Sequence, residues 1–136
     1  MSGFLDTSVV VRYLTGDHEE LAERATGIID GEQELWITDV VLAETSYVLS
    51  SVYQLPKDLI VNQLIELVHK RNIMVHAIDK GLVLQALLMC RPSGRVSIAD
   101  ALLWAAARSS RSEVVYSFDQ RFPSDGLEVR RSIAAS

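Results

Sequence analysis

Short apolar runs with the character of β-strands alternate with longer segments of helical spacing along this chain of 136 residues. The strand-like runs are GFLD at 3–6, ELWIT at 34–38, NIMVHAI at 72–78, EVVYSF at 113–118 and LEVRR at 127–131, the last an expected edge strand. The helical segments are 8–16, 18–31, 39–53, 56–71, 79–90 and 97–110. This alternation implies right-handed crossovers and a mostly parallel sheet with helices on both faces. The length predicts one domain over 1–136.

The charge balance argues against one class of function. The chain has 13 lysines and arginines against 18 aspartates and glutamates, a formal net charge of −5. A protein that grips nucleic acid with a broad basic face is not expected from this composition. A nucleic-acid enzyme is still compatible with it, because metal ions held by clustered acids reverse the local field.

The expected location is the cytoplasm. No apolar run approaches the ~18 residues that a membrane span needs, and the start of the chain, MSGFLDTSVVVRY, has neither a basic n-region nor a small-residue cleavage site. The single cysteine, Cys90, cannot form an internal disulfide, which favours a reducing compartment. We therefore predict no membrane partner.

Four carboxylates are placed where a site is expected in such a fold. In open α/β sheets, ligands bind outside the carboxyl ends of the strands. Asp6 directly follows the first predicted strand, and Asp119 follows the fourth. Glu44 and Asp100 lie near the starts of predicted helices, which can bring their carboxylates to the same edge.

Each carboxylate also has an ordinary structural interpretation. Asp6 could cap a helix, Asp100 could complete a capping box with Ser97, and Asp119 could sit in a turn. Glu44 is harder to explain in this way, because apolar residues surround it in a helix with hardly a polar face. That pattern predicts a buried carboxylate, which is costly unless it is paired or binds a cation.

Taken together, the four acids indicate a metal site. Carboxylates brought close repel one another unless a positive charge compensates them. Oxygen ligands without cysteine or a suitable histidine pattern point to a hard divalent ion, Mg²⁺ or, as a substitute, Mn²⁺. Such ions activate water and stabilise charge in phosphodiester cleavage.

The acids stand in segments that resemble a known family. The segments are FLDTSVVVRYL, ITDVVLAETSYVLSSVYQLPK, SIADALLWAAARS and VVYSFDQRF, and their order and spacing are those of PIN-domain proteins. More narrowly, they are similar to VapC-type toxin ribonucleases of type II toxin–antitoxin systems. The similarity runs over essentially the whole chain.

The resemblance implies a PIN-like three-layer α/β/α fold with a five-stranded, mostly parallel central sheet. It further implies Mg²⁺-dependent endoribonuclease activity on an RNA substrate, homodimerisation and neutralisation by a cognate VapB-type antitoxin. Carried over by position, Asp6, Glu44, Asp100 and Asp119 match the family's catalytic and metal-binding acids. The polar positions beside the site are matched by Thr7, Ser8 and Ser117.

Other interpretations were left open by the residues. Arg12, Arg95 and Arg121 are candidates for contacts with RNA phosphates, against a role as solvated surface. A phosphotransfer protein is disfavoured, because there is no D-x-D motif at Asp6 and no lysine between 81 and 136. Two alternatives keep the fold: an RNA-maturation nuclease without an antitoxin, and a non-catalytic interaction scaffold.

Overall fold

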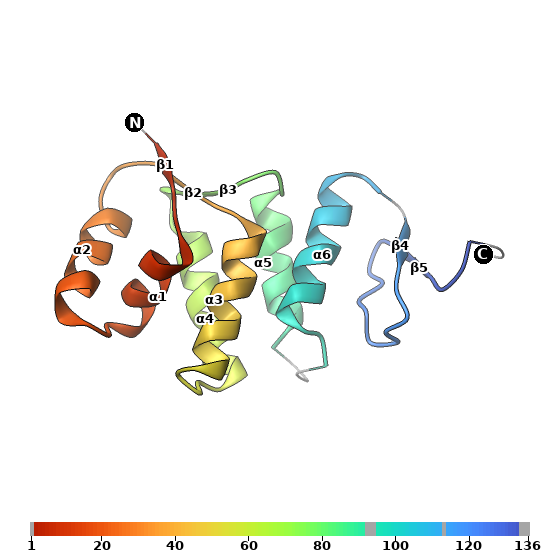
Figure 1. The fold of residues 1–136 in the computed structure, drawn as a ribbon. Coiled ribbons are helices and arrows are strands. Elements are labelled where there is room, and N and C mark those ends of the chain that lie inside the picture. The colour runs from red at the N-terminus through yellow and green to blue at the C-terminus, as the bar shows by residue number, and fades with distance from the viewer. Residues whose placement is uncertain (1, 92–94, 113, 134–136) are drawn as a thin grey trace. The chain divides into compact units, whose positions relative to one another are not determined.

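The computed structural model describes residues 2–91, 95–112 and 114–133, which form two compact units divided between His76 and Ala77. The first unit contains β1 (Gly3–Phe4), α1 (Thr7–Thr15), α2 (Glu19–Ile29), β2 (Leu35–Ile37), α3 (Asp39–Ser51), α4 (Lys57–His69) and β3 (Ile73–Val75) (Figure 1). The second contains α5 (Lys80–Met89), α6 (Ile98–Ser109), β4 (Val114–Tyr116) and β5 (Glu128–Arg130). These elements confirm the predicted α/β alternation. Glu113, expected to begin the fourth strand, lies outside the described residues.

The sheet of the first unit is parallel and has the order β1-β2-β3. Its strands alternate between two faces, as the two-residue repeat of a strand requires. Leu35, Ile37 and Ile73 are buried, whereas Trp36 is half-buried and Phe4 is exposed. Figure 1 shows the helices of this unit on one side of the strands. Within the unit, one face of the sheet therefore builds the core.

Local sequence signals explain where the helices begin and end. Asp6, Thr38, Asp79 and Ser97 are the N-cap residues of α1, α3, α5 and α6, and each side chain accepts a hydrogen bond from a backbone N–H of the first turn. Gly16 ends α1 at a φ of 69°, in the left-handed region that glycine adopts without strain. None of the helices in the described part of the chain is long and apolar enough to cross a membrane.

The prediction of one five-stranded sheet is wrong. In the described residues the strands form a three-stranded sheet in the first unit and a separate two-stranded parallel sheet, β4 with β5, in the second. Each strand has only two or three residues, so few ladder hydrogen bonds hold any one pairing. An apolar run indicates that a strand forms, but it contains no information about its partner.

The first unit is also held by a polar side chain that its sequence pattern does not reveal. Asn72, immediately before β3, donates from Nδ2 to the carbonyl oxygens of Ile29 at 2.9 Å, Gln33 at 3.1 Å and Gly31 at 3.3 Å. These carbonyls belong to the end of α2 and the loop that follows it. Asn72 therefore fixes the path of the chain from α2 into the central strand.

Replacing Asn72 by alanine tests this anchor. Asn72→Ala leaves those carbonyls without their amide donor, and we expect the free energy of unfolding to fall by about 1–3 kcal/mol. Urea denaturation followed by circular dichroism measures the change. The matched control is Gln85→Ala, which removes an exposed amide from α5 and should change the value by less than about 0.5 kcal/mol. Equal effects of the two substitutions would contradict the anchoring role.

Candidate active site

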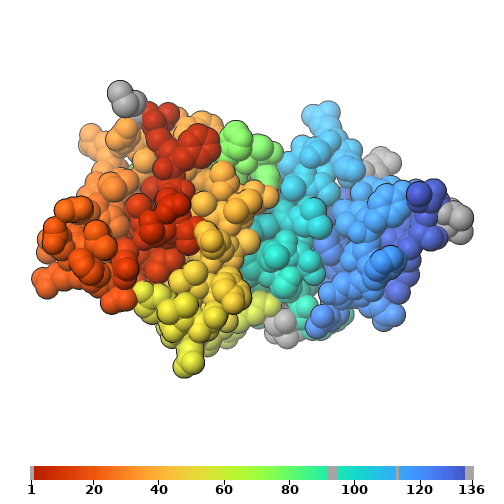
Figure 2. All heavy atoms as spheres, in the orientation of Figure 1, coloured from red at the N-terminus to blue at the C-terminus, as the bar shows by residue number. Residues whose placement is uncertain are grey.

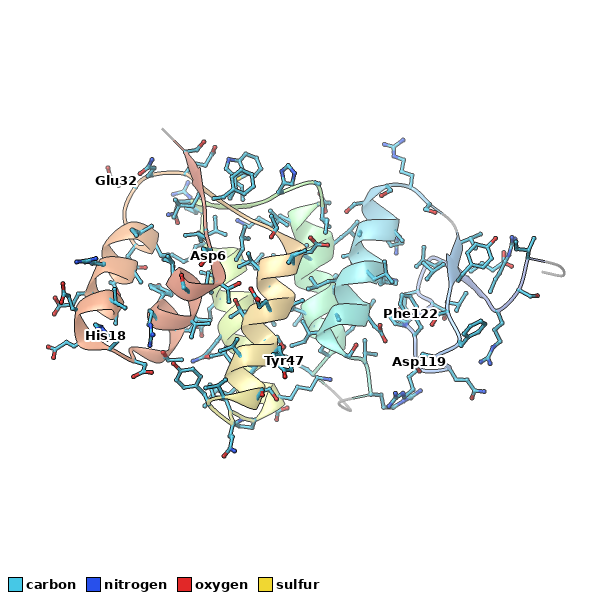
Figure 3. The ribbon with its side chains drawn as sticks, in the orientation of Figure 1. Asp6, His18, Glu32, Tyr47, Asp119 and Phe122 are labelled. Carbon is cyan, nitrogen blue, oxygen red and sulfur yellow. The ribbon has the colours of Figure 1, made fainter. Side chains whose placement is uncertain are left out.

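Asp6 lies where β1 passes into α1, and its side chain both caps the helix and faces solvent (Figure 3). Its Oδ2 accepts hydrogen bonds from the backbone N–H of Ser8 at 3.1 Å and from the Ser8 hydroxyl at 2.6 Å. Both bonds end on the same oxygen, so the lone pairs of Oδ1 remain for a cation. The capping and ligand interpretations of Asp6 are therefore compatible.

Ser8 also stabilises the ionised form of Asp6. The hydrogen bond from the Ser8 hydroxyl, followed by that from its backbone N–H, lowers the pKa of Asp6 below its usual range. Hydrogen bonds to the charged form of a carboxylate stabilise that form. Asp6 is therefore ionised throughout the neutral range, as a ligand for a cation has to be.

Glu44 is joined to the same region by Thr7. The buried Thr7 hydroxyl, in the first turn of α1, donates to Glu44 Oε1 on α3 at 2.5 Å. The expectation that Glu44 is buried is wrong, because its side chain is exposed. The apolar neighbours Val40 and Tyr47, which suggested burial, are themselves each 69% exposed, whereas α3 turns Leu42 and Leu49 inward. An apolar sequence around the whole helix therefore does not show that every face of the helix is buried.

These residues open into a hollow of about 460 Å³ between α1 and α3. In Figure 2 the red atoms of α1 and the orange-yellow atoms of α3 lie side by side on the visible face of the first unit. The hollow is lined by Asp6, Thr7, Ser8, Val11, Arg12, Glu44, Val48, Val52 and Tyr53. The two carboxylates, three hydroxyl groups and one guanidinium in this lining are groups that can bind a charged ligand.

The second unit carries the other two predicted acids. Asp100 is half-buried in the first turn of α6, where its backbone N–H donates to the Ser97 hydroxyl at 3.0 Å, the capping contact expected from the sequence. Asp119 lies in the turn after β4 (Figure 3). Its Oδ1 accepts from the backbone N–H of Arg121 at 2.8 Å and from its Nε at 3.2 Å, and Nη2 lies 3.4 Å from Oδ2.

Arg121 links the charges of these two acids. Its backbone N–H, and then its guanidinium, lowers the pKa of Asp119. The hydrogen bond to Asp119 is the largest cause of the raised pKa of Arg121, and the negative charge of Asp100 adds to it. Asp100 and Asp119 therefore act on the same cationic group, and that group is one of the arginines predicted to contact RNA.

The turn that carries Asp119 is fixed from both sides. The Ser117 hydroxyl accepts from the Asp119 N–H at 3.1 Å, which gives this predicted polar residue a role in orienting the acid. Phe122, a few residues on, is buried. Trp104 and Arg108 of α6 both donate to the carbonyl of Asp125, at 2.8 and 3.1 Å. Sequence reasoning missed this last connection, because both donors are side chains directed at a backbone atom.

Each unit therefore supplies one pair of the predicted acids. Asp6 and Glu44 share the hollow of the first unit, and Asp100 and Asp119 share Arg121 in the second. Within either unit, the described residues contain no group of three or more histidine, cysteine, aspartate or glutamate side chains able to hold a metal ion. Of the other predicted arginines, Arg12 lines the hollow of the first unit, whereas Arg95 is exposed just before α6.

The donor set suits one kind of cation. Carboxylate and hydroxyl oxygens are hard ligands, preferred by Mg²⁺ and Mn²⁺ over softer transition metals. Mg²⁺ keeps several of its waters and takes few protein ligands, so the two carboxylates that line the hollow of the first unit fit this ion.

The fold and the placement of the acids define an α/β protein with parallel strands, a carboxylate at the junction of β1 and α1, another in the turn after β4 and two on helices. Residues 3–124 match the PIN domain family, and this span includes all four acids. No curated protein matches the chain. The chain belongs to the PIN domain family. PIN domains are generally nucleases, and they typically use divalent metal ions such as Mg²⁺.

The effect of Ser8 on Asp6 gives a pH-dependent prediction. Ser8→Ala removes the hydroxyl that is the main cause of the lowered pKa of Asp6, so that pKa should rise toward the ordinary range. Asp6 in the variant then takes up its proton at a higher pH than in wild type. On acidification, the variant should therefore lose Mn²⁺ at a higher pH than wild type does. Titration of the side-chain carboxyl carbon by NMR measures the pKa directly. The control is Ser50→Ala, which changes an exposed serine of α3. An unchanged pKa of Asp6 in Ser8→Ala would refute the assignment of the pKa shift to Ser8.

Proposed function

We propose that this PIN domain protein is a divalent-metal-dependent endoribonuclease, and that Asp6, Glu44, Asp100 and Asp119 all serve one cleavage reaction. The observation that carries the proposal is the family match over 3–124, a span that contains all four acids, together with the hollow of the first unit, where the hydroxyls of Ser8 and Thr7 hold the carboxylates of Asp6 and Glu44. A non-catalytic scaffold is the alternative, and the RNA cleavage experiment below distinguishes the two.

The proposed reaction is hydrolysis of a phosphodiester. A bound divalent ion lowers the pKa of a coordinated water and stabilises the charge that develops on the phosphate. Asp6 and Asp100 are the core ligands in this proposal, with Asp119 and Glu44 binding directly or through water. The water oxygen forms a bond to phosphorus and the bond to O3′ breaks, so the products carry a 5′-phosphate and a 3′-hydroxyl.

The neighbouring polar groups orient the acids for this reaction. Ser8 holds Oδ2 of Asp6 and lowers its pKa, so Oδ1 is the oxygen that would bind the cation. Thr7 holds Oε1 of Glu44, so Oε2 is the oxygen that can accept a hydrogen bond from the attacking water. Ser117 acts on Asp119 through its backbone N–H. All three hydroxyls therefore position ligands and need not touch RNA.

The first experiment is cleavage of total RNA by the purified chain with Mg²⁺ and then with EDTA. We expect discrete fragments that disappear with EDTA. Asp100→Asn should reduce cleavage by at least about 100-fold, because even outer-shell partners of a metal site contribute about 10–100-fold. The control is Asp58→Asn, which changes an exposed aspartate in the first turn of α4, a position matched to that of Asp100 in α6.

Two variants of Asp6 separate capping from catalysis. Asn caps helices as well as Asp, so Asp6→Asn should lose activity with little loss of stability, whereas Asp6→Ala should lose activity and about 1 kcal/mol of stability. Full activity in Asp6→Asn or Asp100→Asn, with the fold intact by circular dichroism, would end the four-carboxylate proposal. No cleavage by wild type with Mg²⁺ or Mn²⁺, once a retained partner is excluded, would favour the scaffold.

We further propose that the chain is the VapC-type toxin of a toxin–antitoxin pair, acts as a homodimer in the cytoplasm and is neutralised by a VapB-type antitoxin. The support is the set of four sequence segments and the short chain without large insertions. A short reading frame abutting this one upstream is expected. Its product should abolish RNA cleavage when added to the purified toxin. Induced expression of wild type should arrest growth, whereas induced expression of Asp100→Asn should not. Activity without any such partner gene would indicate an RNA-maturation nuclease.

A further inference from the structure

Arg12 lines two adjoining hollows of the first unit. One is the hollow between α1 and α3 that contains Asp6 and Glu44. The other, of about 300 Å³, lies between α1 and α2 and is lined by Ser8, Val9, Arg12, Leu21, Arg24, Ala25 and Ile28. Ser8 and Arg12 are the residues common to both. Arg12 therefore lies where the hollow that contains Asp6 and Glu44, here called the acidic hollow, adjoins a mostly apolar groove. This groove has a second arginine, Arg24.

The guanidinium of Arg12 is held by Asp17, and Asp17 is held in turn by Tyr53, both from outside α1. Its Nη1 donates to Asp17 Oδ2 at 3.2 Å, and the hydroxyl of Tyr53 donates to the same oxygen at 2.8 Å. Asp17 follows the turn that ends α1, and its backbone N–H donates to the Thr15 hydroxyl at 3.1 Å. Tyr53 comes just after α3 and lines the acidic hollow. The connection Tyr53–Asp17–Arg12 thus ties the arginine to both walls of the hollow.

This connection leaves most of the guanidinium available for a ligand. A guanidinium has five N–H donors in a planar fork, and the contact with Asp17 uses one of its nitrogens. The side chain of Arg12 is 34% exposed, so it is half-sheltered but reachable. Asp17 is 56% exposed, and water screens its charge, so the pair does not cancel the attraction of Arg12 for a second anion.

We propose that Tyr53 and Asp17 are positioning residues that fix Arg12 to bind a phosphate of single-stranded RNA beside the one that is cleaved. The strand would pass from the acidic hollow into the groove between α1 and α2. The planar fork of arginine suits a phosphate, and the apolar side chains of Val9, Leu21 and Ile28 suit the face of a base or ribose. This inference rests on the proposed ribonuclease function and adds how the substrate is held.

The test compares Arg12→Gln, Tyr53→Phe and the double variant. Arg71→Gln is the control, because it makes the same charge change at an exposed arginine just before β3 that lines neither hollow. The probe is a fluorescent single-stranded RNA that contains a cleavage site mapped from total RNA. Its dissociation constant is measured by anisotropy in EDTA over a series of salt concentrations. KM and kcat for its cleavage are measured with Mg²⁺.

We expect Arg12→Gln to weaken RNA binding and raise KM by about tenfold, the size of a charge-assisted contact, with kcat within twofold. The slope of log Kd against log salt should fall by about 0.7, the value for one phosphate contact on a single strand. Tyr53→Phe should raise KM by a smaller factor, about 2- to 5-fold, and the double variant should be no worse than Arg12→Gln, because the two residues act through one contact. Arg71→Gln should match wild type.

Several results would overturn the inference. An unchanged salt slope in Arg12→Gln would exclude a phosphate contact, and additive losses in the double variant would exclude a shared role for Tyr53. A purely structural role would lower the melting temperature of Tyr53→Phe without changing KM. If wild type cleaves RNA and Arg12→Gln equals it, the inference fails while the nuclease proposal stands. If wild type cleaves nothing but binds a generic single-stranded RNA with an Arg12-dependent slope, the nuclease proposal fails, and with it the placement beside a cleaved phosphate, while the phosphate contact of Arg12 stands.

Discussion

The hydrogen bonds from Ser8 to Asp6 are the interaction that joins the start of α1 to the candidate site of the first unit. They start α1 directly at the end of β1, and they hold a carboxylate ionised at that junction. In a parallel sheet the connecting helices begin at the edge where the strands end, so helix starts and strand ends lie together at that edge. A residue that caps a helix at this edge is therefore automatically placed where a ligand can reach it. Structural and functional demands on Asp6 coincide.

The same principle is repeated with different partners in the second unit. Asp119 is held by the backbone and side chain of Arg121, and Ser117 fixes the turn from the other side. In the second unit, the positive charge that compensates Asp119 comes from Arg121, a residue of the chain itself. The overall charge of −5 therefore says little about either pair of acids, since each is governed by hydrogen bonds over a few residues.

Sequence reasoning was most successful where the signal is local. It predicted the helices and strands to within a few residues, the end of α1 at Gly16 and the contact between Ser97 and Asp100, because caps and periodic patterns act over one or two turns. It failed on strand pairing, since runs of two or three paired residues contain no information on their partners. It also placed Glu44 inside, because an apolar helix does not reveal which of its faces is covered.

Contacts between distant side chains were beyond sequence reasoning for a related reason. Tyr53 reaches Asp17 across 36 positions, and Trp104 reaches the carbonyl of Asp125 across 21. Nothing in periodicity or charge pattern pairs such residues. The choice of the four acids itself rests on family resemblance as much as on chemistry. The match to the PIN domain family supports the family, and the joint action of the acids stays a prediction.

The order of the acids along the chain has a consequence for the cell that makes this protein. Asp6 and Glu44 belong to the half that is synthesised first, and Asp100 and Asp119 to the half that follows. If all four serve one reaction, a chain of which only the first half has been synthesised has two of the four acids that the reaction needs. Nascent chains would then be harmless to the ribosome and to the message being translated.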